Sequence, residues 1–175
     1  MRIVSADESQ IPLILSFIRK LAEYEKLSHE VTADEQSLRH FLFGPKRAAE
    51  VFLAYVGDEA AAFAVIFQNF STFAGRAGIY LEDLFVEPAY RGRGIGKALL
   101  VHLAKLAKER GCGAVNWAVL DWNQPAIDFY RRMGAVPLEE WTVFHLGGEA
   151  LERLAGEAEV SEPAKSTRPT PGLET

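Results

Sequence analysis

The sequence between Tyr80 and Gly111 predicts a strand, a glycine-rich turn and a helix in direct succession, and this unit constrains the fold most. The strand carries two adjacent carboxylates, Glu82 and Asp83, and leads into the turn RGRGIGK. The helix is indicated by apolar residues at helical spacing, namely Leu99, Leu100, Leu103, Leu106 and Ala107. Unpaired N–H groups at the helix start, its dipole and glycines without a Cβ suit such a turn to binding an anion.

The spacing of the glycines excludes two common nucleotide-binding motifs. A Walker phosphate loop has four residues between its glycines and Ser or Thr after the lysine, whereas here three residues intervene and Ala98 follows Lys97. The dinucleotide fingerprint needs a third glycine where Lys97 stands. What remains is R-x-x-G-x-G, which suits a diphosphate, with Arg91 or Arg93 as an outer positive charge. The alternative is a tight turn with surface arginines.

The rest of the chain predicts helices and strands around this unit. Capping patterns at Asp7–Gln10 and Thr32–Glu35 precede two helical stripes. In chain order we predict a strand at 1–5, helices at 11–26 and 32–43, strands at 51–56 and 61–70, the central strand and long helix, a strand at 114–120, a helix at 126–133 and a strand at 136–146. This order predicts one α/β domain over residues 1–155, a mixed sheet with helices on its faces. The tail 156–175 has the composition of a disordered segment.

Composition narrows the class of protein. The chain has 175 residues, enough for one domain with a full core, and a net charge of -5, which fits a cationic small substrate better than nucleic acid. The single Cys112 excludes an internal disulfide, and the four histidines show no metal-ligand spacing. No apolar run reaches the length of a membrane span, and no long apolar signal region opens the sequence. We therefore expect a cytoplasmic protein without a metal.

With these motifs in view, the chain resembles the GNAT superfamily of acetyl-CoA-dependent N-acetyltransferases over roughly residues 1–155. R-x-x-G-x-G is the coenzyme A signature of that superfamily. The segments YLEDLFVEPAYRGRGIG, LDWNQPAIDFY and RRMGA resemble the spermidine/spermine and thialysine acetyltransferase group, and FSTFAGRAGIYLED leans towards its thialysine-type members. The resemblance implies a mostly antiparallel central sheet flanked by helices, a homodimer, and direct acetyl transfer from acetyl-CoA to a primary amine of a small molecule.

The resemblance also implies where acetyl-CoA binds. In the superfamily the central strand parts from the next one, and its free backbone groups hold the pantetheine arm and the acetyl oxygen. The matching positions in this sequence are Leu84, Phe85, Val86, Arg91, Gly92, Arg93, Gly94, Ile95, Gly96, Lys97, Asn123, Pro125 and Ala126. The alternative for Asn123 is an ordinary turn residue.

Two catalytic residues follow from the same resemblance. Tyr130 is the acid that protonates the departing thiolate, which is chemically reasonable because a thiol has a pKa of about 8.5 and a phenol about 10. The alternative is a core aromatic residue. Glu82 faces the amine and takes its proton, directly or through water. Because neighbours on a strand point to opposite faces and burying a lone carboxylate is costly, Glu82 or Asp83 should border a cleft or pair with an arginine.

The amine-binding positions implied by the resemblance are Tyr24, Glu25, Glu82, Asn116, Trp117 and Ala118. The spermidine/spermine enzymes carry a histidine where this chain has Asn116, and an acidic residue in the loop near Thr72. Fewer negative charges argue against long polyamines as acceptors. Two other functions stay open: acetylation of a protein N-terminus or lysine, and a non-catalytic acyl-CoA-binding module, against which Tyr130 argues.

Overall fold

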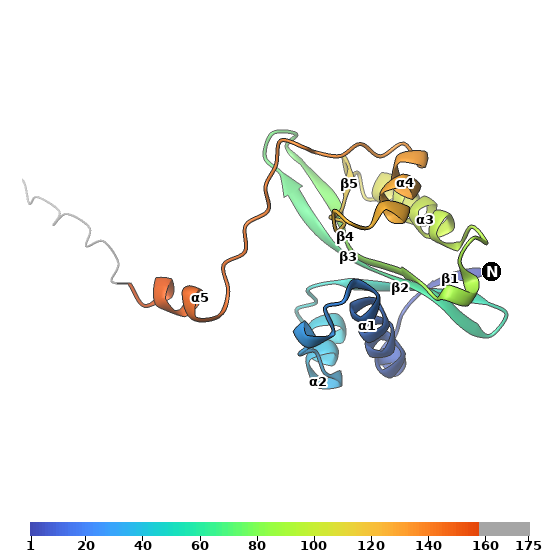
Figure 1. Cartoon of the computed structure of the whole chain (residues 1–175), viewed down its shortest axis with the longest axis horizontal. Helices are drawn as coiled ribbons and strands as arrows, with labels where there is room; N and C mark the ends of the chain where they lie inside the picture. Colours follow the sequence, from blue (N-terminus) through green and yellow to red (C-terminus); the bar gives the residue numbers. More distant parts are fainter. Residues whose placement is uncertain (158–175) are drawn as a thin grey trace, which may run out of the picture. The chain divides into compact units, whose positions relative to one another are not determined.

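The structure is a computed structural model that describes residues 1–157 of the chain. Its elements are β1 (Arg2–Ser5), α1 (Ile11–Glu25), α2 (Glu35–Leu38), β2 (Glu50–Val56), β3 (Glu59–Ser71), β4 (Arg76–Val86), α3 (Ile95–Glu109), β5 (Val115–Asn116), α4 (Gln124–Arg132) and α5 (Gly148–Ala155) (Figure 1). Short 3-10 turns lie at Glu8–Gln10, Ser28–Glu30 and Pro88–Tyr90, and a π-helical turn at Arg39–Phe43 continues α2. Residues 1–135 form one compact unit, and the described residues from 136 to 157 belong to another.

The five strands form one sheet in the order β1-β2-β3-β4-β5. The first three pairings are antiparallel, and β5 runs parallel to β4 after the crossover through α3. The predicted fold class, an α/β protein with a mixed and mostly antiparallel central sheet flanked by helices, is confirmed.

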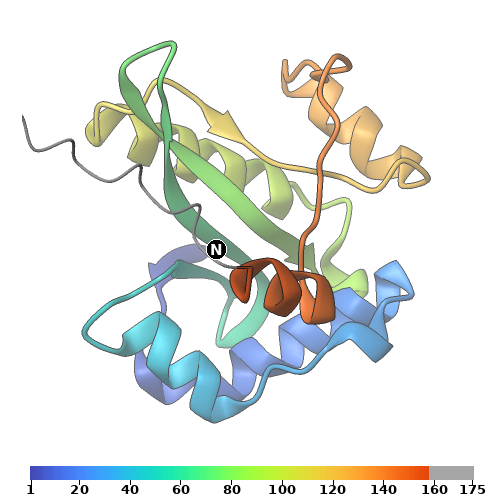
Figure 2. The same ribbon diagram turned by 90° about the vertical axis from the view of Figure 1, so that its left-hand side faces the viewer.

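Helices cover both faces of this sheet (Figures 1 and 2), and each face has its own apolar core. On one face Leu99 and Leu103 of α3 pack against small and branched residues of the strands. On the other face Phe17 of α1 stacks on Phe63 of β3 with ring centroids 5.2 Å apart. Both faces of β3 are therefore buried, which explains its nearly continuous apolar sequence.

A one-residue bulge interrupts β4 at Glu82. The ladder pairs Leu81 with Ile66 and Asp83 with Val65, so Glu82 is left without a partner on β3. A bulge of this kind bends the strand and changes the direction of its side chains.

The packing shows the change of direction. Leu81 lies in the core beneath α3, and Leu84, three residues later, packs against the same core, although residues three apart in a regular strand face opposite sides. Phe85 belongs to the other core. The prediction that Glu82 and Asp83 diverge to opposite faces is therefore wrong, and both carboxylates line one pocket.

Other local predictions need correction. The second helix is capped by Asp34 with Ser37 instead of the predicted Thr32 with Glu35, whereas the Asp7–Gln10 capping box is confirmed. The strand predicted at 114–120 is reduced to β5, and residues 136–146 contain no strand. Sequence periodicity did not predict α5, and from residue 158 on the predicted tail lies outside the described residues.

Candidate active site

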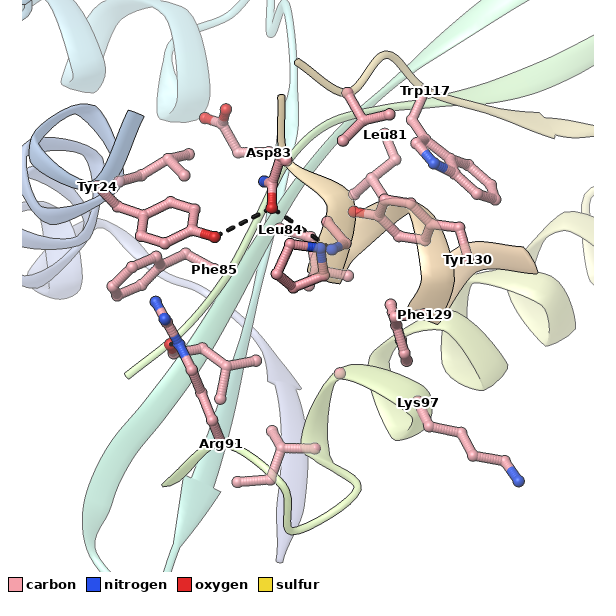
Figure 3. Close-up of a pocket in the computed structure, with 18 of the residues that line it drawn as sticks. Tyr24, Leu81, Asp83, Leu84, Phe85, Arg91, Lys97, Trp117, Phe129 and Tyr130 are labelled. Carbon is pink, nitrogen blue, oxygen red and sulfur yellow. Dashed lines mark hydrogen bonds between the residues drawn. The ribbon is translucent and has the colours of Figure 1, made fainter. Parts of the chain in front are cut away.

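A pocket of about 480 Å³ lies between α1 on one side and α3 and α4 on the other (Figure 3). The parting of two strands accounts for its position. β5 pairs with β4 only at Ile79 and Tyr80, so the later part of β4 has no described ladder on that side. The backbone of Leu84 and Val86 therefore borders the pocket and can bind a ligand there.

The glycine-rich turn forms one end of the pocket. Gly92 and Gly94 have φ angles of 75° and 78°, a left-handed conformation that glycine adopts without penalty. Gly94 is the N-cap of α3, and a Cβ built there would meet no heavy atom within 4 Å. The first amides of α3, at Ile95, Gly96 and Lys97, have no intrahelical partners. This end of the pocket is an open cradle of N–H groups suited to an anion.

The side chains of the two arginines in the turn contact aromatic rings, whereas the sequence predicted one of them as an outer positive charge for the anion. The Arg91 guanidinium lies 4.8 Å from the ring centroid of Tyr24 and 5.5 Å from that of Phe85, and its Nε donates to the Val86 carbonyl at 2.9 Å. Figure 3 shows the Arg91 side chain running towards these rings, away from Lys97. The Arg93 guanidinium lies over Tyr90, and Arg93 does not line the pocket. Lys97 and Arg132 are the other cations along the wall.

Tyr130 comes from α4 and lies in the middle of the pocket wall. Its ring contacts Trp117 and Phe129, with centroid separations of 4.9 and 5.3 Å. Burial raises the pKa of the Tyr130 phenol to about 12, helped by Glu25 and Tyr24 across the pocket. The group is therefore protonated at ordinary pH and can donate a proton.

Three carboxylates give the opposite part of the pocket a negative charge. Burial, together with the neighbouring charges of Glu82 and Glu25, raises the pKa of Asp83 to about 6. Burial also raises the pKa of Glu25. The ion pairs found within residues 1–157 involve none of the three, so Glu82 and Asp83 border a cleft, and the alternative of an arginine partner is not observed. Such a cluster can accept a proton or hold a cation.

The pocket gathers nearly all of the residues that the sequence singled out. Those on its wall are Tyr24, Glu25, Glu82, Leu84, Phe85, Val86, Arg91, Gly92, Gly94, Ile95, Gly96, Lys97, Trp117, Ala118, Asn123, Pro125, Ala126 and Tyr130. Arg93 lies outside, and so does Asn116, which pairs with Tyr80 in the β4–β5 ladder. Their roles stay predictions.

Sequence reasoning missed other wall residues, including Leu21, Phe129 and Arg132. Leu21 precedes Glu25 by one helical turn, a spacing that could have pointed to it. Within residues 1–157, no group of three or more His, Cys, Asp or Glu side chains is placed to hold a metal ion. No helix in the same range is long and apolar enough to cross a membrane.

Comparison with known proteins gives consistent matches. The profile of the family described as "Acetyltransferase (GNAT) family" matches residues 16–135. The thialysine N-epsilon-acetyltransferase of Bos taurus is 40% identical over 162 residues, covering 86% of this chain and 95% of that protein. The L-ornithine N5-acetyltransferase NATA1 of Arabidopsis thaliana is 31% identical and covers 87% of each chain.

Solved structures share the fold. The integron cassette protein VCH_CASS6 from the mobile metagenome of V. cholerae superposes with a TM-score of 0.74 at 29% identity, covering 89% of this chain and 97% of that one. A soil metagenomic aminoglycoside acetyltransferase, meta-AAC0020, has a TM-score of 0.71 at 20% identity, covers 85% and 96%, and shows the fold alone.

Proposed function

Because the chain belongs to the acetyltransferase (GNAT) family and acetylates a small-molecule amine, we propose that acetyl-CoA is its donor and a thialysine-like amino acid, a diamine or a short polyamine its acceptor. The observation that carries this proposal is the polarity of one pocket. An anion cradle lies at one end, three carboxylates lie at the other, and Tyr130 stands on the wall they share.

The cradle fits the diphosphate of the donor. The amides at the start of α3 and the left-handed Gly94 allow the close approach of a phosphate, and Lys97 supplies a positive charge. The exposed edge of β4 at Leu84 and Val86 would hold the pantetheine arm through main-chain hydrogen bonds. Asn123, Pro125 and Ala126 form the facing wall.

The carboxylates fit a cationic acceptor. An alkyl ammonium with a pKa of about 10.4 is charged at neutral pH, so Glu25, Glu82 and Asp83 favour its entry electrostatically. Trp117 and Ala118 supply apolar surface for its methylene groups, and Asn116 holds the strand pairing beneath them. Both a short diamine and a lysine-like side chain present such an ammonium group to the three carboxylates. Two relatives named above are, by their names, acetyltransferases of thialysine and of L-ornithine.

The proposed mechanism is direct transfer within a ternary complex. Acetyl-CoA supplies an activated acetyl thioester. Glu82 takes the ammonium proton, directly or through water, and the neutral amine then attacks the carbonyl carbon. Backbone N–H groups of β4 stabilise the oxygen as negative charge develops on it. The carbon–sulfur bond breaks, and Tyr130, which its raised pKa keeps protonated at ordinary pH, donates its proton to the departing thiolate.

A panel of amines tests the proposal. The full chain is incubated with acetyl-CoA and, separately, thialysine, lysine, ornithine, putrescine, spermidine and a lysine peptide, and products are identified by mass spectrometry. We expect mono-acetylation of the small amines at the terminal nitrogen. Acetylation of the peptide alone would instead support a protein acetyltransferase. Binding of acetyl-CoA without any acetylated product would support the non-catalytic alternative.

We also propose a homodimer in the cytoplasm. Residues 136–146 supply the motive for the dimer, because large apolar side chains there are exposed: Trp141 is 70%, Val143 87% and Phe144 91% accessible. An extended apolar segment of this kind can pair with the sheet edge of a second copy. The location stays a prediction.

A further inference from the structure

One side chain, Tyr24, connects the acceptor side of the pocket to the donor side. It lies one residue before the end of α1, next to Glu25. Its hydroxyl donates to Asn123 Oδ1 at 3.0 Å, and its ring carries the Arg91 guanidinium at 4.8 Å from the centroid. Tyr24 therefore contacts both the turn that precedes α4 and the arginine that opens the glycine-rich turn.

The contact with Asn123 bears on how α4 is held. Asn123 is the N-cap of α4, and its side-chain oxygen also accepts from Ala126 N at 3.4 Å. It is 6% exposed and is the buried polar side chain of the described core. The Tyr24 hydroxyl thus supplies a second donor to the one oxygen that fixes the start of this helix.

The helix itself has little other anchorage. None of the nine residues of α4 is fully buried, so core packing does not fix its orientation. On its inner side Tyr130 contacts Trp117, and Phe129 lies against the α3 start at Gly96. A short helix held by so few contacts depends on its cap for its position.

These contacts connect Tyr24 to Tyr130 through Asn123 and α4. Figure 3 shows the Tyr24 and Tyr130 rings entering the pocket from opposite sides. Asn123 Oδ1 accepts from the Tyr24 hydroxyl and from Ala126 N at the start of the helix that carries Tyr130. Building on the proposed function, we propose that Tyr24 is a positioning residue: through Asn123 it holds α4 in place and thereby aligns the Tyr130 hydroxyl with the departing sulfur. The role assigned to Tyr24 by resemblance, a wall of the amine site, does not include this.

The same side chain links the two substrates. Arg91 is fixed between the Tyr24 ring and the Val86 carbonyl, at the end of the strand that borders the donor. Trp122 extends the contact, with its ring 6.1 Å from that of Tyr24 and the Lys26 ammonium 5.5 Å from its centroid.

Tyr24→Phe is the informative variant, because it keeps the ring and its contacts with Arg91 and Trp122 and removes only the hydroxyl. Tyr55→Phe is a matched control. The Tyr55 hydroxyl also makes one side-chain hydrogen bond, with Gln10, and its ring also carries an arginine, Arg2, at 4.4 Å, yet Tyr55 does not line the pocket.

The first measurement needs no substrate. Hydrogen–deuterium exchange of the full chain should show the α4 amides of Tyr24→Phe exchanging roughly three- to tenfold faster than in the wild type, as expected for the loss of one hydrogen bond. Tyr55→Phe should leave α4 unchanged. Unchanged α4 exchange in Tyr24→Phe would overturn the proposal, even if no amine in the panel were acetylated and the proposed function failed.

The second measurement is a double-mutant cycle. Tyr24→Phe should lower kcat roughly three- to tenfold and alter the KM for acetyl-CoA less than about twofold. In a Tyr130→Phe background it should lower kcat no further, because its effect passes through the hydroxyl already removed. An equal loss in both backgrounds, or a raised KM for the amine with unchanged kcat, would show that Tyr24 acts on the acceptor and not on Tyr130.

Discussion

Asp83→Asn should stabilise the ligand-free protein at high pH. The Asp83 carboxyl is largely buried, with a pKa raised from 3.8 to about 6 by burial and by Glu82 and Glu25. Since one pKa unit corresponds to about 1.36 kcal/mol, the ionised form costs the fold about 3 kcal/mol at a pH above about 6. An amide of the same shape avoids that cost, and for a chain of this length the melting temperature should rise by roughly 6–12 °C.

The sign of the pH dependence makes the prediction specific. Because the folded-state pKa is raised, the folded protein binds the proton more tightly than the unfolded chain. The stabilisation from that proton is complete below about pH 3.8 and is lost as the pH rises through about 6. The advantage of Asp83→Asn should therefore be full at about pH 8 and vanish at about pH 4.

Urea unfolding at a series of pH values measures this difference, with Asp58→Asn as the control because Asp58 lies exposed in the β2–β3 turn. The control should change stability little at every pH. An Asp83→Asn protein that is no more stable than wild type at about pH 8, or a difference that does not depend on pH, would refute the assignment of a buried, uncompensated charge. It would mean instead that Asp83 has a favourable partner in solution.

Three further predictions concern the proposed reaction and assembly. Tyr130→Phe should lower kcat at least roughly tenfold in an assay of acetylated product. Because the phenol pKa is about 12, the loss should be the same across the working pH range. A variant with full turnover would show that the Tyr130 ring only packs. Gly94→Val forces a branched residue to a φ of 78° in the cradle and should weaken acetyl-CoA binding at least roughly tenfold by calorimetry, with unchanged affinity counting against the diphosphate site. Light scattering at micromolar concentration should give a particle of about twice 19.4 kDa. Replacing the exposed Trp141 and Phe144 by serine should convert this dimer to the monomer. A monomeric wild-type protein would exclude the proposed pairing.

The parts of the fold that were predictable are those determined by near neighbours in the sequence. The central strand, its glycine-rich turn and α3 follow from apolar periodicity and helix-start chemistry, and α3 runs from Ile95 to Glu109. The strand expected at 136–146 shows the limit. Its apolar residues indicate a tendency to form a strand, but a strand exists only where a partner offers hydrogen bonds, and local sequence does not reveal that partner.

The pocket likewise has parts that near neighbours in the sequence determine and parts that depend on distant residues. The cradle of N–H groups could be predicted because its amides belong to one short motif, R-x-x-G-x-G, at one helix start. The direction of Arg91 could not, because it depends on Tyr24 and Phe85, which come from distant elements. For Asn123 the sequence left a coenzyme A contact or an ordinary turn residue open, and nothing in the turn sequence shows that a tyrosine 99 residues earlier reaches its side chain.

The bulge at Glu82 lies between the two halves of the pocket. Leu81 and Leu84 are three positions apart and yet pack against the same core, whereas Phe85 belongs to the other one, so only the packing reveals the bulge. The inserted residue, Glu82, rotates the strand and brings Glu82 and Asp83 to the pocket. It lies two residues after Tyr80, the last residue of β4 that pairs with β5. The edge proposed to hold the donor and the carboxylates proposed to hold the acceptor thus meet at a single irregularity of the backbone. Deleting Glu82 would restore the regular alternation of the strand and turn either the exposed edge or the carboxylates away from the pocket.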